Sequence, residues 1–331
     1  MRLTYVKNLF RLIGVYVKGS DFFTYRMYKK HHNNQPNDGV LQSVSERRFA
    51  IVIQGPVVEN DNFTLSTIEL YRCHFPNAII ILSTWTVSPI LLEAAEKFNV
   101  HVIQNKPPDN PGISNINFQI TTSSSGVLAA KELGAHYALK TRTDQRIYHP
   151  SLETYLFNLI ESFPLSRNVT NQASRLVGTS LDTMKYRLYG IGDHFLYGHI
   201  DDMINYWNIP LDSREKLDEE FDTTTMTWRK FSKLRVGGVY LCSEFLQRIG
   251  YDLAWTLKDS FNTIRDRFVI IDSASIKMYW HKYTLNDDRY PQYGLFDPEL
   301  SFNDWLILYG SMKDLIIDEK ILDKPTKKVS K

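Results

Sequence analysis

The feature that most constrains the fold is a regular alternation of short apolar runs and helix-length segments between residues 48 and 148. Runs of this kind that end in Gly, Pro or polar residues are typical of buried parallel strands. The predicted strands are Arg48–Pro56, Ala78–Trp85, Val100–Asn105 and His136–Tyr148, and the predicted helices are Phe63–Cys73, Pro89–Phe98 and Phe118–Leu133. Because strand–helix–strand crossovers are right-handed, the alternation predicts an α/β fold with an open, mainly parallel sheet flanked by helices.

The second half of the chain is less regular. Residues 186–199 are predicted to form two short strands around Gly192-Asp193. Further helices are predicted at Met203–Trp207, Leu217–Phe221 and Tyr240–Gly250, after which the segment Phe268–Ser273 leads to Met278–Tyr283. Gly134 is the expected C-cap of the preceding helix, and the Lys-rich tail after Tyr309 is expected to fray.

The composition excludes several classes of protein. The 331 residues carry a formal net charge of +2. A protein that mainly binds nucleic acid has a much stronger excess of basic residues. Cys73 and Cys242 are too few for a disulfide framework, and neither has the neighbours of a structural zinc site. We therefore expect two buried thiols in a reducing compartment and a globular α/β protein.

The first 18 residues have the pattern of a basic amphipathic helix. Apolar residues recur there at helical spacing, while Lys7, Arg11 and Lys18 lie on or beside the other side. Arg11 interrupts the apolar run, so we do not expect a signal peptide. No stretch approaches the roughly 18 apolar residues that span a bilayer. The helix either lies on an anionic membrane surface or packs on its own domain, and residues 29–47 are expected to be a linker.

Polar, small and aromatic residues gather where the predicted strands end. In open parallel sheets, ligands bind beyond the carboxyl ends of the strands. Those ends carry Gln54-Gly55-Pro56, Ser83-Thr84-Trp85, Gln104-Asn105 and Thr141–Arg146. We therefore expect the functional site at this edge of the sheet.

The strongest constellation is Lys140-Thr-Arg-Thr-Asp-Gln-Arg146 at the end of the fourth strand. The Asp144 carboxylate is suited to Mg²⁺ or Mn²⁺, which would neutralise charge on a diphosphate leaving group. Arg142 and Arg146 are suited to bidentate contacts with phosphate. The alternative is an Asp–Arg ion-pair network that only caps the sheet.

Amides cluster at the start of the predicted helix 118–133. Asn115, Asn117 and Gln119 are placed to contact a ribose or base, and a helix N-terminus also attracts anions. The alternative is a structural role, because Asn is a favoured N-cap residue and one of these is expected to cap the helix.

The second half offers candidates for the acceptor side and for the metal. Asp193 and Glu244 are candidate general bases or groups that orient an acceptor hydroxyl. His281, set among aromatic residues, is a candidate metal ligand together with Asp144, and Lys282 is a candidate phosphate contact. A lone His is usually structural, and Glu244 has a structural ion pair as its alternative.

These segments together resemble the WavE lipopolysaccharide synthesis family, from about residue 48 to residue 310. The resemblance is carried by Ile53–Pro56, Phe75-Pro76, Leu82–Trp85, Asn115–Ile120, Lys140–Ile147, Gly192-Asp193, Tyr197-Gly198, Ser243-Glu244 and Trp280–Tyr283. It implies a glycosyltransferase of lipopolysaccharide or capsule synthesis with a GT-A-like fold, in which a DxD motif ends a strand and binds the metal–nucleotide. Asp144 holds that place, but Arg142 and Arg146 stand two residues away instead of acids, and arginines can replace the charge of a cation.

The predicted reaction is transfer of a sugar from a nucleoside diphosphate or monophosphate sugar to a saccharide acceptor of lipopolysaccharide, O-antigen or capsule. Gln54 and Gly55 are expected to lie beside the base and ribose, with Thr84 and Trp85 near the base. The acceptor is expected to be lipid-linked or an oligosaccharide. The expected location is cytoplasmic, and peripheral on the inner face of the plasma membrane in the case where residues 1–18 lie on the membrane surface. No nucleic-acid partner is expected.

The expected domain organisation follows from these roles. It is an N-terminal extension and linker (1–47), a nucleotide-sugar-binding α/β half (48–165), an acceptor-side half of the same catalytic domain (166–310) and a tail (311–331). Two alternatives remain. A sugar nucleotidyltransferase is expected to carry a Gly- and Lys-rich loop after the first strand, and Gln54–Val58 has no basic residue. A non-catalytic carbohydrate-binding or scaffold protein of surface-polysaccharide assembly needs no carboxylate among cations.

Overall fold

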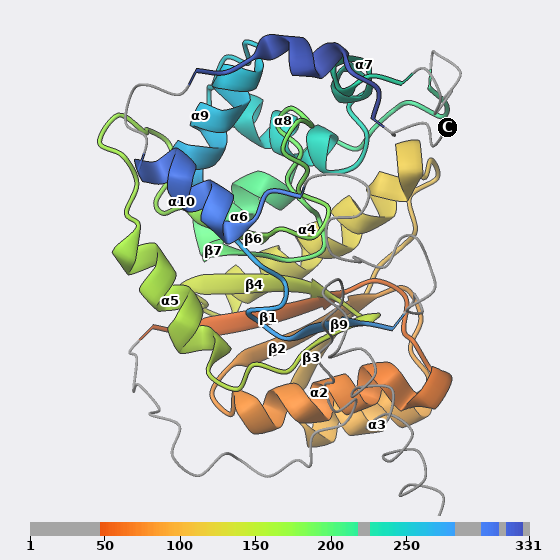
Figure 1. Ribbon diagram of the computed structural model, residues 1–331. Helices are drawn as coiled ribbons and strands as arrows, with labels where there is room; N and C mark the ends of the chain where they lie inside the picture. Colours follow the sequence, from red (N-terminus) through yellow and green to blue (C-terminus); the bar gives the residue numbers. More distant parts are fainter. Residues whose placement is uncertain (1–46, 218–225, 282–298, 311–315, 327–331) are drawn as a thin grey trace, which may run out of the picture. The chain divides into compact units, whose positions relative to one another are not determined.

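A computed structural model describes residues 47–217, 226–281, 299–310 and 316–326, all within the unit of residues 36–331. Within these ranges seven strands form one sheet (Figure 1). In spatial order they are β3 (Val100–Gln104), β2 (Ile79–Thr84), β1 (Phe49–Gln54), β4 (Tyr137–Arg142), β7 (Leu196–His199), β6 (Leu176–Thr179) and β8 (Phe268–Ile271). Only β7 runs antiparallel to its neighbours in this sheet. The predicted open, mainly parallel sheet is confirmed.

Helices cover both faces of the sheet (Figure 1). Helices α2 (Phe63–His74) and α3 (Pro89–Lys97) lie on one face, and α4 (Ile116–Glu132) and α6 (Ile200–Trp207) on the other. The other helices of the described residues are α5 (Leu152–Ser162), α7 (Trp228–Lys233), α8 (Gly238–Arg248), α9 (Leu257–Arg267) and α10 (Phe302–Gly310), with short 3₁₀ helices at Asn60–Asn62, Ile113–Asn115 and Glu319–Asp323.

The parallel half forms where the sequence pattern predicts it. All six residues of β1 are buried, as expected for a strand covered on both faces by helices. Helix α4 ends as predicted at Gly134, whose φ of 83° is left-handed. The N–H of Ala135 then reaches back to the carbonyl of Ala130, at 2.9 Å, which closes the helix in the manner of a Schellman motif.

The predicted strand His136–Tyr148 is wrong as a single element, because it is two strands in two sheets. After β4, the N–H of Thr143 donates to the carbonyl of Gln54 and its hydroxyl to that of Pro56, which ties the turn to the end of β1. The chain then forms β5 (Gln145–Ile147), which pairs antiparallel with β9 (Met278–Trp280). The polar residues of the motif therefore mark a change of sheet.

Only one of the two strands predicted within residues 186–199 exists, namely β7. Backbone donors of the first part are taken by side chains of distant helices. The N–H of Leu188 donates to the Ser232 hydroxyl and that of Tyr189 to the Ser260 hydroxyl, each at 2.9 Å. A segment held in this way has no backbone donors left for a strand partner at these positions.

The tail is partly ordered, contrary to the expected fraying. Leu322 of the 3₁₀ helix Glu319–Asp323 is fully buried. The Glu319 carboxylate accepts hydrogen bonds from the N–H groups of Leu257 and Lys258 at the start of α9, each at 3.0 Å. Such a carboxylate satisfies donors that a helix leaves unpaired at its first turn.

Several predictions lie outside the described residues. They are the amphipathic helix at 1–18, the linker up to residue 46, residues 218–221 of the helix predicted at 217–221, and Lys282. No helix of the described residues combines the length and the apolar character needed to cross a membrane. Both cysteines are free thiols, with Cys242 buried and Cys73 half-buried.

Candidate functional site

The sheet topology brings two parts of the sequence to one edge. Strands β1, β2, β3 and β4 are parallel, so their carboxyl ends share this edge. Strand β7 is antiparallel to β4, with Lys140 opposite Leu196, so the residues just before β7 reach the same edge. Asp193 and His194 therefore lie beside the end of β4, which carries Arg142 and leads to Asp144.

Asp144 is held by two partners from distant parts of the chain. Its Oδ1 accepts from Arg142 Nε at 2.8 Å, and its Oδ2 accepts from Arg142 Nη2 at 3.0 Å. The indole Nε1 of Trp280, on β9, also donates to Oδ2, at 3.0 Å. The Arg142 guanidinium lies over the Trp280 ring, 5.6 Å from its centroid. These three residues form a rigid charged unit at the strand end.

The Arg142 guanidinium keeps the Asp144 carboxyl ionised. Burial by itself raises the pKa of Asp144, but the hydrogen bonds and charge of Arg142 and the Trp280 indole outweigh it, so the pKa lies below its ordinary value. Asp144 is therefore ionised at neutral pH. Arg142 keeps 23% of its side chain exposed, at the edge where ligands bind in such sheets.

Trp280 joins this unit to the residues before β7. The His194 ring meets the Trp280 ring edge to face, with centroids 4.4 Å apart. His194 Nε2 lies 3.6 Å from Asp193 Oδ1, and its Nδ1 lies 3.2 Å from Gln145 Nε2. Burial lowers the pKa of His194, so its imidazole is neutral at pH 7. One continuous cluster therefore runs from Arg142 to Asp193.

Asp193 is partly buried and stays ionised. Burial raises the pKa of this carboxyl, but the opposing effect of His194, Lys140 and Arg142 is larger. The pKa therefore lies below its ordinary value. The Lys140 ammonium donates to the Asp193 carbonyl oxygen and lies 4.5 Å from the centroid of the Trp207 ring. Burial lowers the pKa of Lys140 to about 7. Gln119 Nε2 also donates to the Asp193 carbonyl oxygen, at 2.9 Å, so one predicted ligand-binding amide positions Asp193 instead.

Arg146 does not join Arg142. Its guanidinium is buried and turned toward α2, where Nε donates to the Thr67 hydroxyl and Nη2 to the Phe63 carbonyl, both at 2.8 Å. It also lies over the Phe63 ring, 4.3 Å from the centroid. The structure therefore separates the two arginines that the sequence placed on one phosphate, because the chain changes sheet between them.

The residues predicted to contact base and ribose are mostly engaged within the protein. Gln54 is buried, and its Oε1 accepts from the Thr122 hydroxyl at 2.8 Å. Gly55 has a φ of 116° and allows the sharp turn at the end of β1. Thr84 is fully buried, whereas Trp85 is half-buried and meets the Phe118 ring with centroids 5.6 Å apart. Only Trp85 among these four presents side-chain surface to a ligand.

The amides at the start of α4 have separate structural roles. Asn115 occupies the N-cap position in a left-handed conformation, but its side chain makes no capping hydrogen bond. Asn117 is buried and clamps another segment: its Nδ2 donates to the Asp212 carbonyl at 2.8 Å, and its Oδ1 accepts from the Asp212 N–H at 2.7 Å. The expected side-chain cap is therefore absent at Asn115, which is exposed beside the edge of the sheet.

Glu244 and His281 each have a structural partner. Arg235 Nη2 donates to Glu244 Oε1 at 2.6 Å, as the ion-pair alternative predicts. The His281 N–H donates to the Asp144 carbonyl at 2.9 Å, while its ring stacks on Phe63 with centroids 4.5 Å apart. Lys282 lies outside the described residues. Among the described residues, the group of three side chains able to hold a metal is Asp182, Asp193 and His194.

The sequence interpretation missed three members of the cluster as functional residues: Trp280, His194 and Asp182. Trp280 stands in the motif Trp280–Tyr283, but its indole reaches Asp144 across 136 residues of sequence. His194 follows Asp193 directly and was available from the same segment. Asp182 has no sequence signal, because it stands alone in a loop between β6 and β7.

Comparisons with known proteins identify the family. The profile of the family described as "WavE lipopolysaccharide synthesis" matches residues 49–287. A comparison with curated proteins gave no match. Similar solved structures include HddC from Yersinia pseudotuberculosis, with 11% identity, coverage of 53% of this chain and 84% of that chain, and a TM-score of 0.31. A nucleotidyl transferase from Methanothermobacter has 14% identity, coverage of 50% and 78%, and a TM-score of 0.31. Similarity at this level carries no argument about function.

Proposed function

This chain belongs to the WavE lipopolysaccharide synthesis family, and from that premise we propose that it is a glycosyltransferase. It moves a sugar from a nucleotide sugar to a saccharide hydroxyl of a lipid-linked or oligosaccharide acceptor. The donor diphosphate binds at Arg142, and the acceptor hydroxyl lies at Asp193. A membrane-surface address through residues 1–18 would suit a lipid-linked acceptor.

The observation that carries this proposal is the joining of the Arg142–Asp144 ion pair to a second carboxylate, Asp193, through one indole. Trp280 contacts Arg142, Asp144 and the ring of His194, whose neighbour is Asp193. A guanidinium is a favoured phosphate ligand because it carries five N–H donors, of which Asp144 takes two in Arg142. An ionised carboxylate is the group that accepts a proton from an attacking hydroxyl. Group transfer with an anionic leaving group needs both at one place.

The contacts of Asp144 favour Arg142 over a metal as the source of positive charge. Both Asp144 oxygens already accept hydrogen bonds, and the Arg142 guanidinium is a bidentate partner of the carboxylate. A divalent cation at Asp144 would have to displace or repel that guanidinium. The ring of His281 is stacked on Phe63, and His281 does not belong to the group of three described side chains able to hold a metal. We therefore propose that Arg142 neutralises the negative charge of the departing diphosphate. No step uses a metal at Asp144.

The chemical step balances as follows for an inverting enzyme. The acceptor oxygen forms a bond to the anomeric carbon while the bond from that carbon to the phosphate oxygen breaks. The hydroxyl proton passes to the Asp193 carboxylate, and the electron pair of the broken bond stays on the nucleoside diphosphate beside Arg142. We favour Asp193 over Glu244 as the base, because Glu244 is paired with Arg235. A retaining enzyme would need no such base.

The experiment combines a donor panel with a matched pair of variants. Calorimetry with UDP-, GDP- and CMP-sugars should show saturable binding with a preference for one nucleotide. An Asp144→Ala protein that still folds should transfer or hydrolyse the preferred donor about 10²–10³-fold more slowly, because Arg142 loses its anchor. Asp201→Ala is the control, since Asp201 pairs with Lys131 on an exposed surface.

Three results would contradict the proposal. Wild-type rates in the Asp144→Ala protein would show that the site lies elsewhere. A chain that prefers no nucleotide would be a scaffold or carbohydrate-binding protein. If the chain instead consumed a nucleoside triphosphate and a sugar phosphate and released pyrophosphate, it would be a nucleotidyltransferase.

A further inference from the structure

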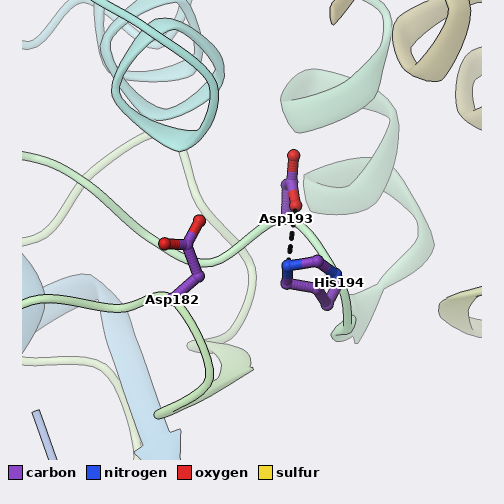
Figure 2. Close-up of side chains that lie close together, drawn as sticks. All are labelled: Asp182, Asp193 and His194. Atoms are coloured by element: carbon purple, nitrogen blue, oxygen red, sulfur yellow. Dashed lines mark ion pairs between the residues drawn. The ribbon is translucent and has the colours of Figure 1, made fainter. Parts of the chain in front are cut away.

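We propose that Asp182, Asp193 and His194 bind one divalent transition-metal ion, such as Zn²⁺ or Mn²⁺, at the carboxyl edge of the sheet. One ligand atom from each residue lies within 4.8 Å of the other two. Figure 2 shows Asp182 and the pair Asp193 and His194 on two parts of the connection between β6 and β7. This site is separate from Asp144, and the inference does not rest on the proposed glycosyl transfer.

The spacing of Asp193 and His194 is that of two ligands on one ion. His194 Nε2 and Asp193 Oδ1 are 3.6 Å apart, which is too long for a hydrogen bond. Bonds of about 2.0–2.2 Å to a common metal place two ligand atoms about 3.0–3.5 Å apart. A small rotation of either side chain therefore suffices to coordinate an ion between them.

The two parts of the β6–β7 connection that supply the ligands are held together by close backbone contacts. The N–H of Gly192 donates to the Thr183 hydroxyl at 2.8 Å. A Cβ atom at Gly192 would lie 2.1 Å from the Leu181 carbonyl oxygen, so only glycine permits this approach. Asp182 lies between Leu181 and Thr183 in the sequence, and Asp193 follows Gly192. The ligands are therefore positioned by packed backbone, which reduces the cost of assembling a metal site.

Gln145 supplies the second, independent observation. It is fully buried on β5 and points at the His194 ring, with Nε2 3.2 Å from Nδ1, while its Oε1 has no hydrogen-bond partner among the described residues. If the Gln145 side-chain amide is flipped by 180°, its Oε1 accepts a hydrogen bond from the Nδ1–H of His194. That hydrogen bond fixes the tautomer whose Nε2 lone pair points toward Asp193. Metal-binding histidines regularly carry such a partner on the second ring nitrogen.

The donor set selects the kind of metal. One imidazole nitrogen with two carboxylates suits Zn²⁺ or Mn²⁺, whereas Ca²⁺ and Mg²⁺ prefer sites made of oxygen alone. Arg187 Nη1 donates to Asp182 Oδ1 at 2.9 Å, so Oδ2 is the oxygen of Asp182 assigned to the ion. Three protein ligands leave coordination positions for water or a substrate hydroxyl.

The consequence for catalysis rests on the proposed function. An ion bound here would be held by one oxygen of Asp193, on the acceptor side, and would lower the pKa of a bound acceptor hydroxyl, whose proton would pass to the other Asp193 oxygen. The metal would then act on the nucleophile, while Arg142 meets the leaving group. The binding site itself is tested without any sugar.

The experiment titrates the chelator-treated full chain with ZnCl₂ and, separately, MnCl₂ by calorimetry. Wild type should bind one equivalent. Asp182→Asn and His194→Gln should each weaken binding by at least about tenfold, and Gln145→Leu by about 10- to 100-fold. Asp144→Asn is the matched control and should keep the full equivalent, because it lies outside the group.

The outcomes separate the proposal from its rivals. Circular dichroism and a melting curve check that each variant folds. If His194→Gln does not fold, Asp182→Asn still carries the test, since 39% of the Asp182 side chain is exposed. The proposal is overturned if wild type shows no saturable binding, if Asp182→Asn binds as tightly as wild type, or if Asp144→Asn is the variant that loses the metal.

Discussion

The two parts of the carboxyl edge use their polar residues in opposite ways. At the ends of β1 and β2 and the start of α4, polar side chains bond to the protein itself, as Gln54 does to Thr122 and Asn117 to Asp212. At the ends of β4 and β6 and the start of β7, charged side chains gather around Trp280, and Asp193 and His194 face each other without a hydrogen bond. The first part shapes the edge, and the second has groups available for chemistry.

The largest effect is expected at Asp193, in the second part. Asp193→Asn keeps the size of the side chain and removes the charge, so transfer should fall by about 10²–10⁴-fold, as for loss of a general base. Donor affinity should change little, because the donor lies at Arg142. Single-turnover rates and calorimetry measure the two quantities, with Glu244→Gln as the control. A larger loss of transfer rate in the Glu244→Gln protein would show that Glu244 on α8 is the base instead of Asp193.

The two arginines of the motif offer the sharpest contrast. Arg142→Lys should weaken donor binding roughly 10- to 100-fold, as expected for one charge-assisted hydrogen bond worth about 1.5–3 kcal/mol. Arg146→Lys should leave donor affinity unchanged and lower the free energy of unfolding, because Arg146 bonds to Thr67 and Phe63 inside the protein. Calorimetry and urea unfolding of both variants test this. Equal losses of affinity would show that both arginines meet the donor.

Asn117 tests whether the first part is structural. Asn117→Ala leaves the N–H and carbonyl of Asp212 without their partner, so the free energy of unfolding should fall by about 1–3 kcal/mol. Urea unfolding measures this change. Donor affinity should stay within about threefold of wild type, well under the tenfold that 1.4 kcal/mol represents. An affinity loss without a stability loss would place Asn117 in the donor site after all.

The smallest effect concerns pH. Burial raises the pKa of Asp212, but the bidentate Arg214 outweighs it, so the folded pKa lies below the ordinary value. The ion pair therefore stabilises the fold above about pH 4, and this stabilisation is lost as the pH falls through the folded pKa. The difference in unfolding free energy between wild type and Asp212→Asn should shrink between pH 5 and pH 3. A difference that grows toward acid pH would contradict this assignment.

Much of the fold could be predicted from the sequence, because buried parallel strands and their helices leave long, clear patterns. The bounds of β1, β2 and β3 differ from the predicted ones by one or two residues. The break at Thr143–Asp144 could not be predicted, because it depends on hydrogen bonds to the end of β1. The same local pattern is compatible with one continuous strand.

The candidate site was predictable only in part. Asp144 and Arg142 were identified because charged residues that end an apolar strand are unusual. The roles of Trp280 and Asp182 depend on contacts between distant segments, which a single sequence does not reveal. Arg146 was grouped with Arg142 because the two are close in sequence, but the change of sheet turns it toward α2.

The most direct test of the account is a crystal structure of the chain with the nucleoside diphosphate of its preferred donor. The account predicts a phosphate oxygen within hydrogen-bonding distance of the Arg142 guanidinium, with the nucleoside running toward the ends of β1 and β2. Density for the diphosphate away from this edge, with Arg142 touching only Asp144 and Trp280, would contradict it.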